Sequence, residues 1–153
     1  MTFREKLLWV SMIAVAAIWG SYLFDVGKVL TYRSVNADQA YGGFIKSVML
    51  LVAVEVVAAI ALSILSPADA KAAADMRDRE FAASAAVPAY NLLNWLIVVT
   101  MLATPGIVRL APQYISGDPA TVTAVLIGNA MMLALVLAHI VYCGAQIRRY
   151  RRG

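Results

Sequence analysis

The chain has 153 residues, of which 62% are hydrophobic and only 14% are charged. A soluble domain typically has about 45–50% apolar and about 25% charged residues, so the composition indicates a membrane protein with room for one domain. The single cysteine, Cys143, excludes an intramolecular disulfide framework and a Cys-rich metal site. The net charge of +4 would suggest nucleic-acid binding in a soluble protein, but the basic residues here flank apolar segments, which indicates contact with the lipid bilayer and not with nucleic acid.

Four segments approach or reach the length of about 20 mainly apolar residues that a helix needs to cross a bilayer core. Turn and helix-breaking residues separate them: a Gly-Gly pair before the second, Ser-Pro after it, Thr-Pro-Gly after the third and Gly-Asp-Pro before the fourth. The first segment has a basic start like a signal peptide, but its apolar stretch continues without a break, so we interpret it as an uncleaved span. We predict one all-α integral membrane domain over residues 1–153, a bundle of four transmembrane helices at residues 7–24, 44–65, 87–104 and 120–143.

The segment between the second and third spans, residues 66–86, is rich in alanine, which favours a helix. Ser66 can cap this helix, with Pro67 at its first position. We predict a short cytoplasmic helix here, which can continue towards the third span until Pro88 disturbs it.

Lysine and arginine are distributed unequally between the two sides of the predicted spans. Nine of them lie beside both termini and in residues 66–86, whereas four lie in or beside residues 25–43 and 105–119. By the positive-inside rule, we expect both termini and residues 66–86 in the cytoplasm. A basic tail directly after the fourth span is the strongest topology anchor, formed by Arg148, Arg149, Arg151 and Arg152.

A polar layer is predicted near the middle of the membrane. Glu55 and Asn94 lie near the centres of the second and third spans, and Asn129 lies slightly off the centre of the fourth. Polar groups in a membrane usually face other helices and hydrogen-bond there, so we favour an interhelical contact among these three residues. The alternative is a proton or cation site at Glu55, because an ionisable residue inside a membrane is by default a functional candidate.

His139 is the only histidine, and it lies ten residues after Asn129, about 15 Å further along the helix. We therefore expect it far in depth from Glu55, so that a direct relay between the two is disfavoured. One histidine without neighbouring cysteines does not form a metal site, and we predict no cofactor.

A charged stretch precedes the third span: Asp75-Met76-Arg77-Asp78-Arg79-Glu80-Phe81. It can be a solvated collar of ion pairs or a docking surface for a cytoplasmic partner. This stretch, followed by a span containing Tyr90, resembles uncharacterised bacterial four-helix inner-membrane proteins with a cytoplasmic D-E-R-D-R-x-I-type loop before the third span. Here Met76 replaces the usual glutamate, and Phe81 stands near the usual isoleucine. The resemblance implies a four-span inner-membrane protein of unknown activity.

Three function classes are compatible with these features. We favour a non-enzymatic multi-pass membrane protein, a partner-binding subunit or signalling element that docks through its charged helix, and a homo-oligomer is compatible with this reading. The alternative is a small proton- or cation-coupled transporter centred on Glu55. A membrane enzyme ranks last, because the interfacial carboxylates are interleaved with arginines and no catalytic constellation accompanies them.

Overall fold

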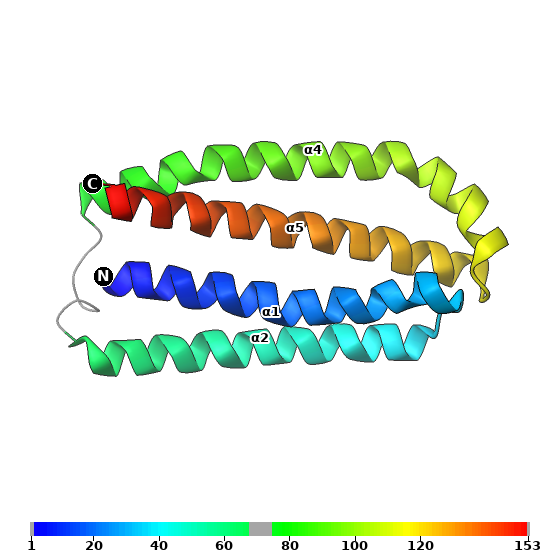
Figure 1. The fold of residues 1–153 in the computed structure, drawn as a ribbon, viewed down its shortest axis with the longest axis horizontal. Helices are drawn as coiled ribbons and strands as arrows, with labels where there is room; N and C mark the ends of the chain where they lie inside the picture. The colour runs from blue at the N-terminus through cyan, green and yellow to red at the C-terminus, as the bar shows by residue number, and fades with distance from the viewer. Residues whose placement is uncertain (1, 68–74, 153) are drawn as a thin grey trace.

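Each predicted span forms one long helix in the computed structural model, which describes residues 2–67 and 75–152 (Figure 1). The four helices of this described part are each long and apolar enough to cross a membrane, which confirms the expected all-α fold. They are α1 (Phe3–Tyr32), α2 (Ala37–Leu65), α4 (Met76–Tyr114) and α5 (Pro119–Arg152).

Side-chain oxygens cap the start of each helix by accepting a hydrogen bond from a backbone N–H three residues later. Thr2, Asn36 and Asp75 cap α1, α2 and α4, and Asp118 accepts from the N–H of Thr121 at the start of α5. Such caps satisfy backbone donors that have no partner within the helix. The helices consequently begin abruptly, and the connections at residues 33–36 and 115–118 are short.

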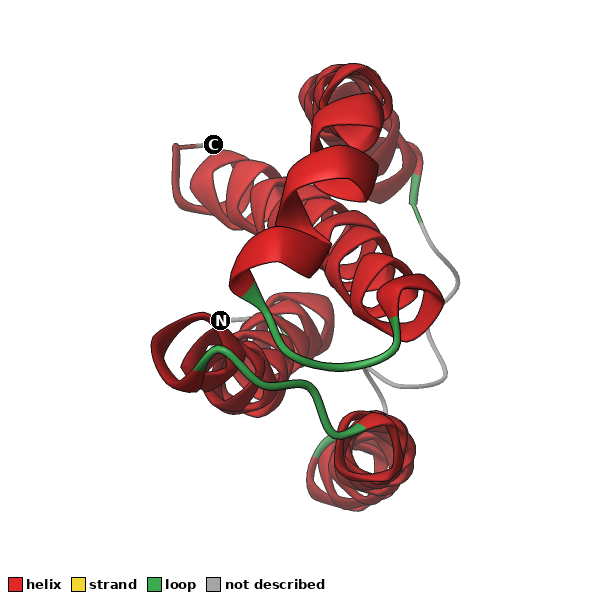
Figure 2. Ribbon diagram, turned by 90° about the vertical axis from the view of Figure 1, so that its right-hand side faces the viewer, coloured by secondary structure: helices red, strands yellow, loops and turns green. Residues whose placement is uncertain are grey.

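The helices lie side by side in the order α4, α5, α1, α2, so that α1 and α5 occupy the middle (Figures 1 and 2). Both termini lie at one end of the bundle, which we call the terminal end, and the two short connections lie at the other, which we call the loop end. One cluster of buried residues lies between α1 and α5, where Trp19, Tyr22 and Val136 pack together. Phe44 of α2 joins this core, with its ring centroid 5.6 Å from that of Trp19.

The two connections at the loop end pair with each other. The N–H of Val35 donates to the carbonyl of Ser116 at 3.2 Å, and the N–H of Ser116 donates to the carbonyl of Arg33 at 2.7 Å. Gly117 next to this bridge has φ +143°, a conformation that glycine adopts without strain. The α1–α2 pair is therefore tied to the α4–α5 pair by backbone hydrogen bonds.

The third helix is longer than its predicted span. We expected it to end at Thr104-Pro105-Gly106, but α4 continues through Pro105 to Tyr114 and bends near its C-terminal end (Figure 1). The hydroxyls of Thr100 and Thr104 donate to carbonyls one turn back, at 2.8 Å each. A proline is tolerated in a membrane helix where local adjustments and neighbouring hydroxyls satisfy the backbone, so proline alone was a poor stop signal.

The segment that we predicted to form a short cytoplasmic helix also differs from expectation. Residues 76–86 are the first turns of α4, capped by Asp75 and continuous through Pro88, and not a separate short helix. The remaining part of that prediction falls on residues 68–74, which lie outside the described residues. The charged stretch is thus rigidly joined to the third span.

Candidate functional site

Three helices bring their polar side chains together inside the bundle. The Ser11 hydroxyl of α1 donates to Oε1 of Glu55 on α2 at 2.7 Å, and its oxygen lies 3.1 Å from Nε2 of His139 on α5. The sulfur of Cys143, one turn further along α5, lies 3.4 Å from the same nitrogen. We call Ser11, Glu55, His139 and Cys143 the Glu55 cluster. It is the candidate functional site.

The central contact of this cluster fits two protonation states of Glu55. A serine hydroxyl has one proton to donate and can accept from other donors. When Glu55 is ionised, Ser11 donates to it and accepts from the N–H of His139. When Glu55 is protonated, it can donate to Ser11, and Ser11 then donates to Nε2 of His139 in the tautomer that carries its proton on Nδ1. The same three heavy atoms therefore satisfy either state, which is the property that a proton-binding site needs.

A groove of about 490 Å³ reaches the cluster, with Glu55 and His139 in its wall. Side chains of all four helices line it, including the aromatic rings of Trp19, Tyr90 and Tyr142. The remaining lining is apolar: Val15, Leu51, Ala89, Leu93, Met132, Leu135, Val136 and Ala138. The groove therefore combines one carboxylate with an aromatic and aliphatic surface.

The three-residue layer expected at the midplane is not brought together. Glu55 lies about 15 Å from the terminal end, Asn94 about 27 Å and Asn129 about 35 Å, counted from the helix ends at Leu65, Met76 and Arg152. Asn94 is exposed on α4, and Asn129 donates to the carbonyl of Val125 on its own helix at 2.7 Å. The helices extend unequally beyond their apolar segments, so equal positions within those segments do not mean equal depth.

We expected a large difference in depth between Glu55 and His139, and this expectation was wrong for the same reason. Measured from the terminal end, Ser11 lies at about 12 Å and His139 at about 20 Å, on either side of Glu55 in depth. Ser11 and Cys143 are the members of the cluster that sequence reasoning missed. The available signal for Ser11 was a serine in an apolar span, at a distance from the terminal end similar to those of Glu55 and His139.

A second set of polar contacts, which we call the terminal cluster, joins the helices where the termini meet. Asp78 of α4 accepts from Arg4 of α1, with Nε–Oδ2 3.0 Å, and from the hydroxyl of Tyr150 of α5. Arg151 of α5 lies 3.7 Å from the buried Glu5 of α1. The terminal cluster comprises Arg4, Glu5, Asp78, Tyr150 and Arg151, and it ties α1, α4 and α5 together.

The predicted docking residues therefore have different surroundings. Asp78 forms an ion pair with Arg4 within the protein, and Asp75 caps α4. The guanidinium of Arg77 lies 5.1 Å from the centre of the Phe81 ring. Arg79 and Glu80 are exposed. The four arginines of the predicted topology anchor, at positions 148, 149, 151 and 152, are all exposed, and Arg151 also lies over the Trp9 ring at 5.3 Å.

Over residues 2–67 and 75–152, the chain does not bring three His, Cys, Asp or Glu side chains close enough to hold a metal ion. Comparisons with family models, curated proteins and solved structures found no match. The function is therefore inferred from the geometry of the site.

Proposed function

We propose that the protein is a small proton-coupled membrane transporter in which the Glu55 cluster binds and releases a proton. One observation carries this proposal: the Ser11 hydroxyl links a carboxylate to an imidazole inside an apolar bundle. The carboxylate of Glu55 and the imidazole of His139 both lie in the wall of the groove. A charged group held in such surroundings without a fixed counter-ion changes its protonation state more readily than one in an ion pair.

The groove supports a lipophilic cation as the substrate class. A carboxylate attracts a positive charge, and the rings of Trp19, Tyr90 and Tyr142 offer faces that bind cations. Proton and cation would compete for Glu55, because a protonated carboxyl no longer attracts a cation. This competition gives exchange: the cation leaves when a proton arrives, and the proton leaves when the cation binds.

Uptake of tetraphenylphosphonium into proteoliposomes with an imposed pH gradient tests this proposal. We expect the wild type to couple its movement to proton flow in the opposite direction. Glu55→Gln keeps the hydrogen-bonding shape but removes titration, so it should abolish the coupled flux. Asn94→Ala, a change at an exposed polar residue on α4, should leave the flux unchanged. Equal flux in the wild type and in Glu55→Gln would refute the proposal.

A partner-binding role is the second candidate, and the exposure of Arg79 and Glu80 at the start of α4 favours it. In this case the protein is a non-enzymatic subunit or signalling element that docks a cytoplasmic protein through these side chains. The double variant Arg79→Ala/Glu80→Ala should then lose a protein that co-purifies with the wild type. The same set of co-purifying proteins for both would count against docking at this position.

For either role, we propose a bacterial inner membrane with both termini in the cytoplasm, supported by the excess of lysine and arginine at the terminal end. Labelling with a membrane-impermeant maleimide tests this orientation in a Cys143→Ser background. In intact cells Gln113→Cys at the loop end should be labelled and Arg149→Cys should not. The reverse pattern would invert the topology.

A further inference from the structure

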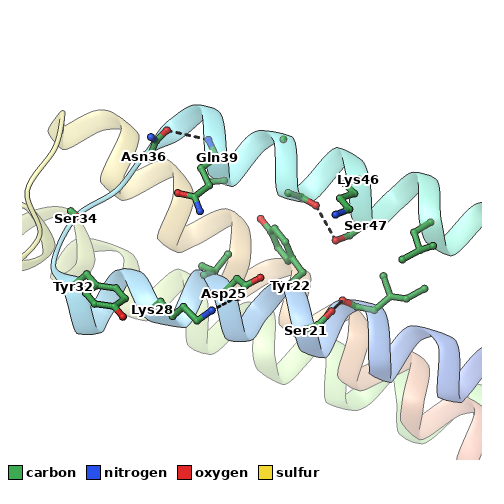
Figure 3. Close-up of a pocket in the computed structure, with 16 residues that line it drawn as sticks. Ser21, Tyr22, Asp25, Lys28, Tyr32, Ser34, Asn36, Gln39, Lys46 and Ser47 are labelled. Atoms are coloured by element: carbon green, nitrogen blue, oxygen red, sulfur yellow. Dashed lines mark hydrogen bonds and ion pairs between the residues drawn. The ribbon is translucent and has the colours of Figure 1, made fainter.

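A second cavity lies at the loop end, between α1 and α2, away from the Glu55 cluster (Figure 3). Its volume is about 920 Å³, larger than the groove at Glu55. Polar side chains from both helices surround it, among them Asp25 and Lys28 of α1 and Gln39 and Lys46 of α2 (Figure 3). None of these residues takes part in the proposed proton site.

The charged side chains that line the cavity carry an excess of positive charge. Lys28 is neutralised by Asp25, with Nζ–Oδ1 2.6 Å (Figure 3). The hydroxyls of Ser21 and Ser47 donate to carbonyls of their own helices, at 2.8 and 2.9 Å. Among the described residues, no carboxylate lies within ion-pair distance of the ammonium of Lys46. The cavity therefore offers one unneutralised cation, which favours an anionic ligand.

The depth of the lining residues favours an amphiphilic ligand. Lys46 lies nine residues into α2, about 13.5 Å from the loop end. Leu50 lies one turn deeper, and it lines the cavity together with Ile18 of α1. Polar groups thus surround the mouth and apolar groups form the floor. The head of a lipid carries its charge at the membrane surface and its chains towards the interior, which matches this order.

A glycine keeps one wall of the cavity open. A Cβ atom added at Gly42 would meet no atom of the described residues within 4 Å, so the space beside it is unfilled. Gly42 lines the cavity, and a side chain can be added there without a clash at its Cβ atom. The cavity can therefore be closed by substitution while Lys46 is kept.

We propose that this cavity binds the phosphate headgroup of an anionic membrane lipid, with Lys46 contacting the phosphate. The Gln39 amide at the mouth supplies a further donor to the headgroup oxygens. The lipid is held at the loop end by this contact, and its chains extend along the apolar surface of α2.

Native mass spectrometry of the detergent-purified protein, titrated with phosphatidylglycerol, tests the proposal. Lys46→Gln should weaken binding about tenfold, since a charge-assisted hydrogen bond is lost. Gly42→Leu should weaken binding to a similar degree with Lys46 intact, because the side chain fills the cavity. Gly20→Leu is the matched control, since it changes an exposed glycine of α1 outside the cavity. Arg109→Gln is the control for charge, and both controls should bind as the wild type does.

Three results would overturn the proposal. The first is equal phosphatidylglycerol binding by the wild type and Lys46→Gln. The second is equal binding of phosphatidylglycerol and the zwitterionic phosphatidylcholine, which would mean that net charge is not recognised. The third is displacement of the lipid by inorganic phosphate alone, which would make free phosphate the ligand. Circular dichroism of each variant confirms that its helices are retained, and Gly42→Leu is favoured on this point because leucine forms helix better than glycine.

Discussion

The Glu55 cluster and the terminal cluster both join three helices through a carboxylate, but the two carboxylates have different neighbours. In the terminal cluster, Asp78 faces the guanidinium of Arg4, so its negative charge has a fixed counter-ion. In the Glu55 cluster, the carboxylate faces a hydroxyl and, through it, an imidazole. A carboxylate in a fixed ion pair stays ionised, whereas a carboxylate that is hydrogen-bonded to a hydroxyl can gain or lose a proton. The terminal cluster is thus suited to holding helices together, and the Glu55 cluster to binding protons.

Removal of Asp78 should have the largest effect on stability. Asp78→Ala leaves Arg4 and Tyr150 without their common acceptor, so we expect the free energy of unfolding to fall by about 2–3 kcal/mol. Denaturation with SDS in mixed micelles measures this change. Glu80→Ala, two residues along the same helix but exposed, should fall within about 0.5 kcal/mol of the wild type. Equal losses in the two variants would show that the terminal cluster does not hold the helices.

Ser11→Ala should have the next largest effect, because it removes the hydroxyl between Glu55 and His139. We expect a loss of about 1.5 kcal/mol, together with loss of coupling between the titrations of the two groups. Coupling is measured as the change in the His139 titration, followed by NMR, when Glu55 is replaced by Gln. Ser63→Ala is the matched control, since that hydroxyl donates to the carbonyl of Ala59 on its own helix. Unchanged coupling in Ser11→Ala would mean that the two groups communicate without the hydroxyl.

Tyr150→Phe should destabilise the protein by about 1 kcal/mol. The change removes the hydrogen bond to Asp78 but keeps the ring, which packs edge-on against Phe81 with centroids 5.2 Å apart. The same SDS denaturation measures the loss. Tyr114→Phe at the exposed end of α4 provides the comparison and should show no loss. A larger loss than that of Asp78→Ala would reverse the order of the contacts in the terminal cluster.

Asp118 should give the smallest effect, and one that depends on pH. The backbone N–H and the hydroxyl of Thr121 both donate to its carboxylate, which lowers its pKa below the usual 3.8. Because the folded pKa is below the unfolded one, its contribution to stability is complete above the unfolded pKa and is lost as the pH falls through the folded pKa. Asp118→Asn can still accept at the cap but does not titrate, so its stability should fall less than that of the wild type below about pH 4. Parallel stability curves in acid would contradict this.

The spans were predictable from the sequence because a long apolar segment has few alternatives to a membrane helix. The ends of the spans were less predictable, since Pro88 and Pro105 lie inside α4 and do not bound it. The depth of each polar residue was then misjudged, because the helices continue past their apolar segments by different lengths. Asn94 and Asn129 were grouped with Glu55 on this basis, and Ser11 was left out.

The rotation of each helix about its axis also lies beyond sequence reasoning here. Ser11, Glu55 and His139 meet only because three separate helices turn these side chains towards one point. The cavity at Lys46 has the same origin, since its lining comes from two antiparallel helices and the connection between them. Apolar patterning gives little help, because lipid-facing and core-facing positions of a membrane helix are both apolar.

The protonation of Glu55 itself tests the central claim most directly. Infrared difference spectroscopy of the reconstituted protein, titrated between about pH 4 and 9, follows the C=O stretch of a protonated carboxyl group. The other eight acidic side chains contribute to this band at low pH, so the signal of Glu55 is the difference between the wild type and Glu55→Gln. We predict that this difference grows as the pH falls and has a different midpoint in the His139→Gln background. If the wild type and Glu55→Gln give the same spectra throughout this range, Glu55 does not titrate there and the cluster is a fixed contact between helices.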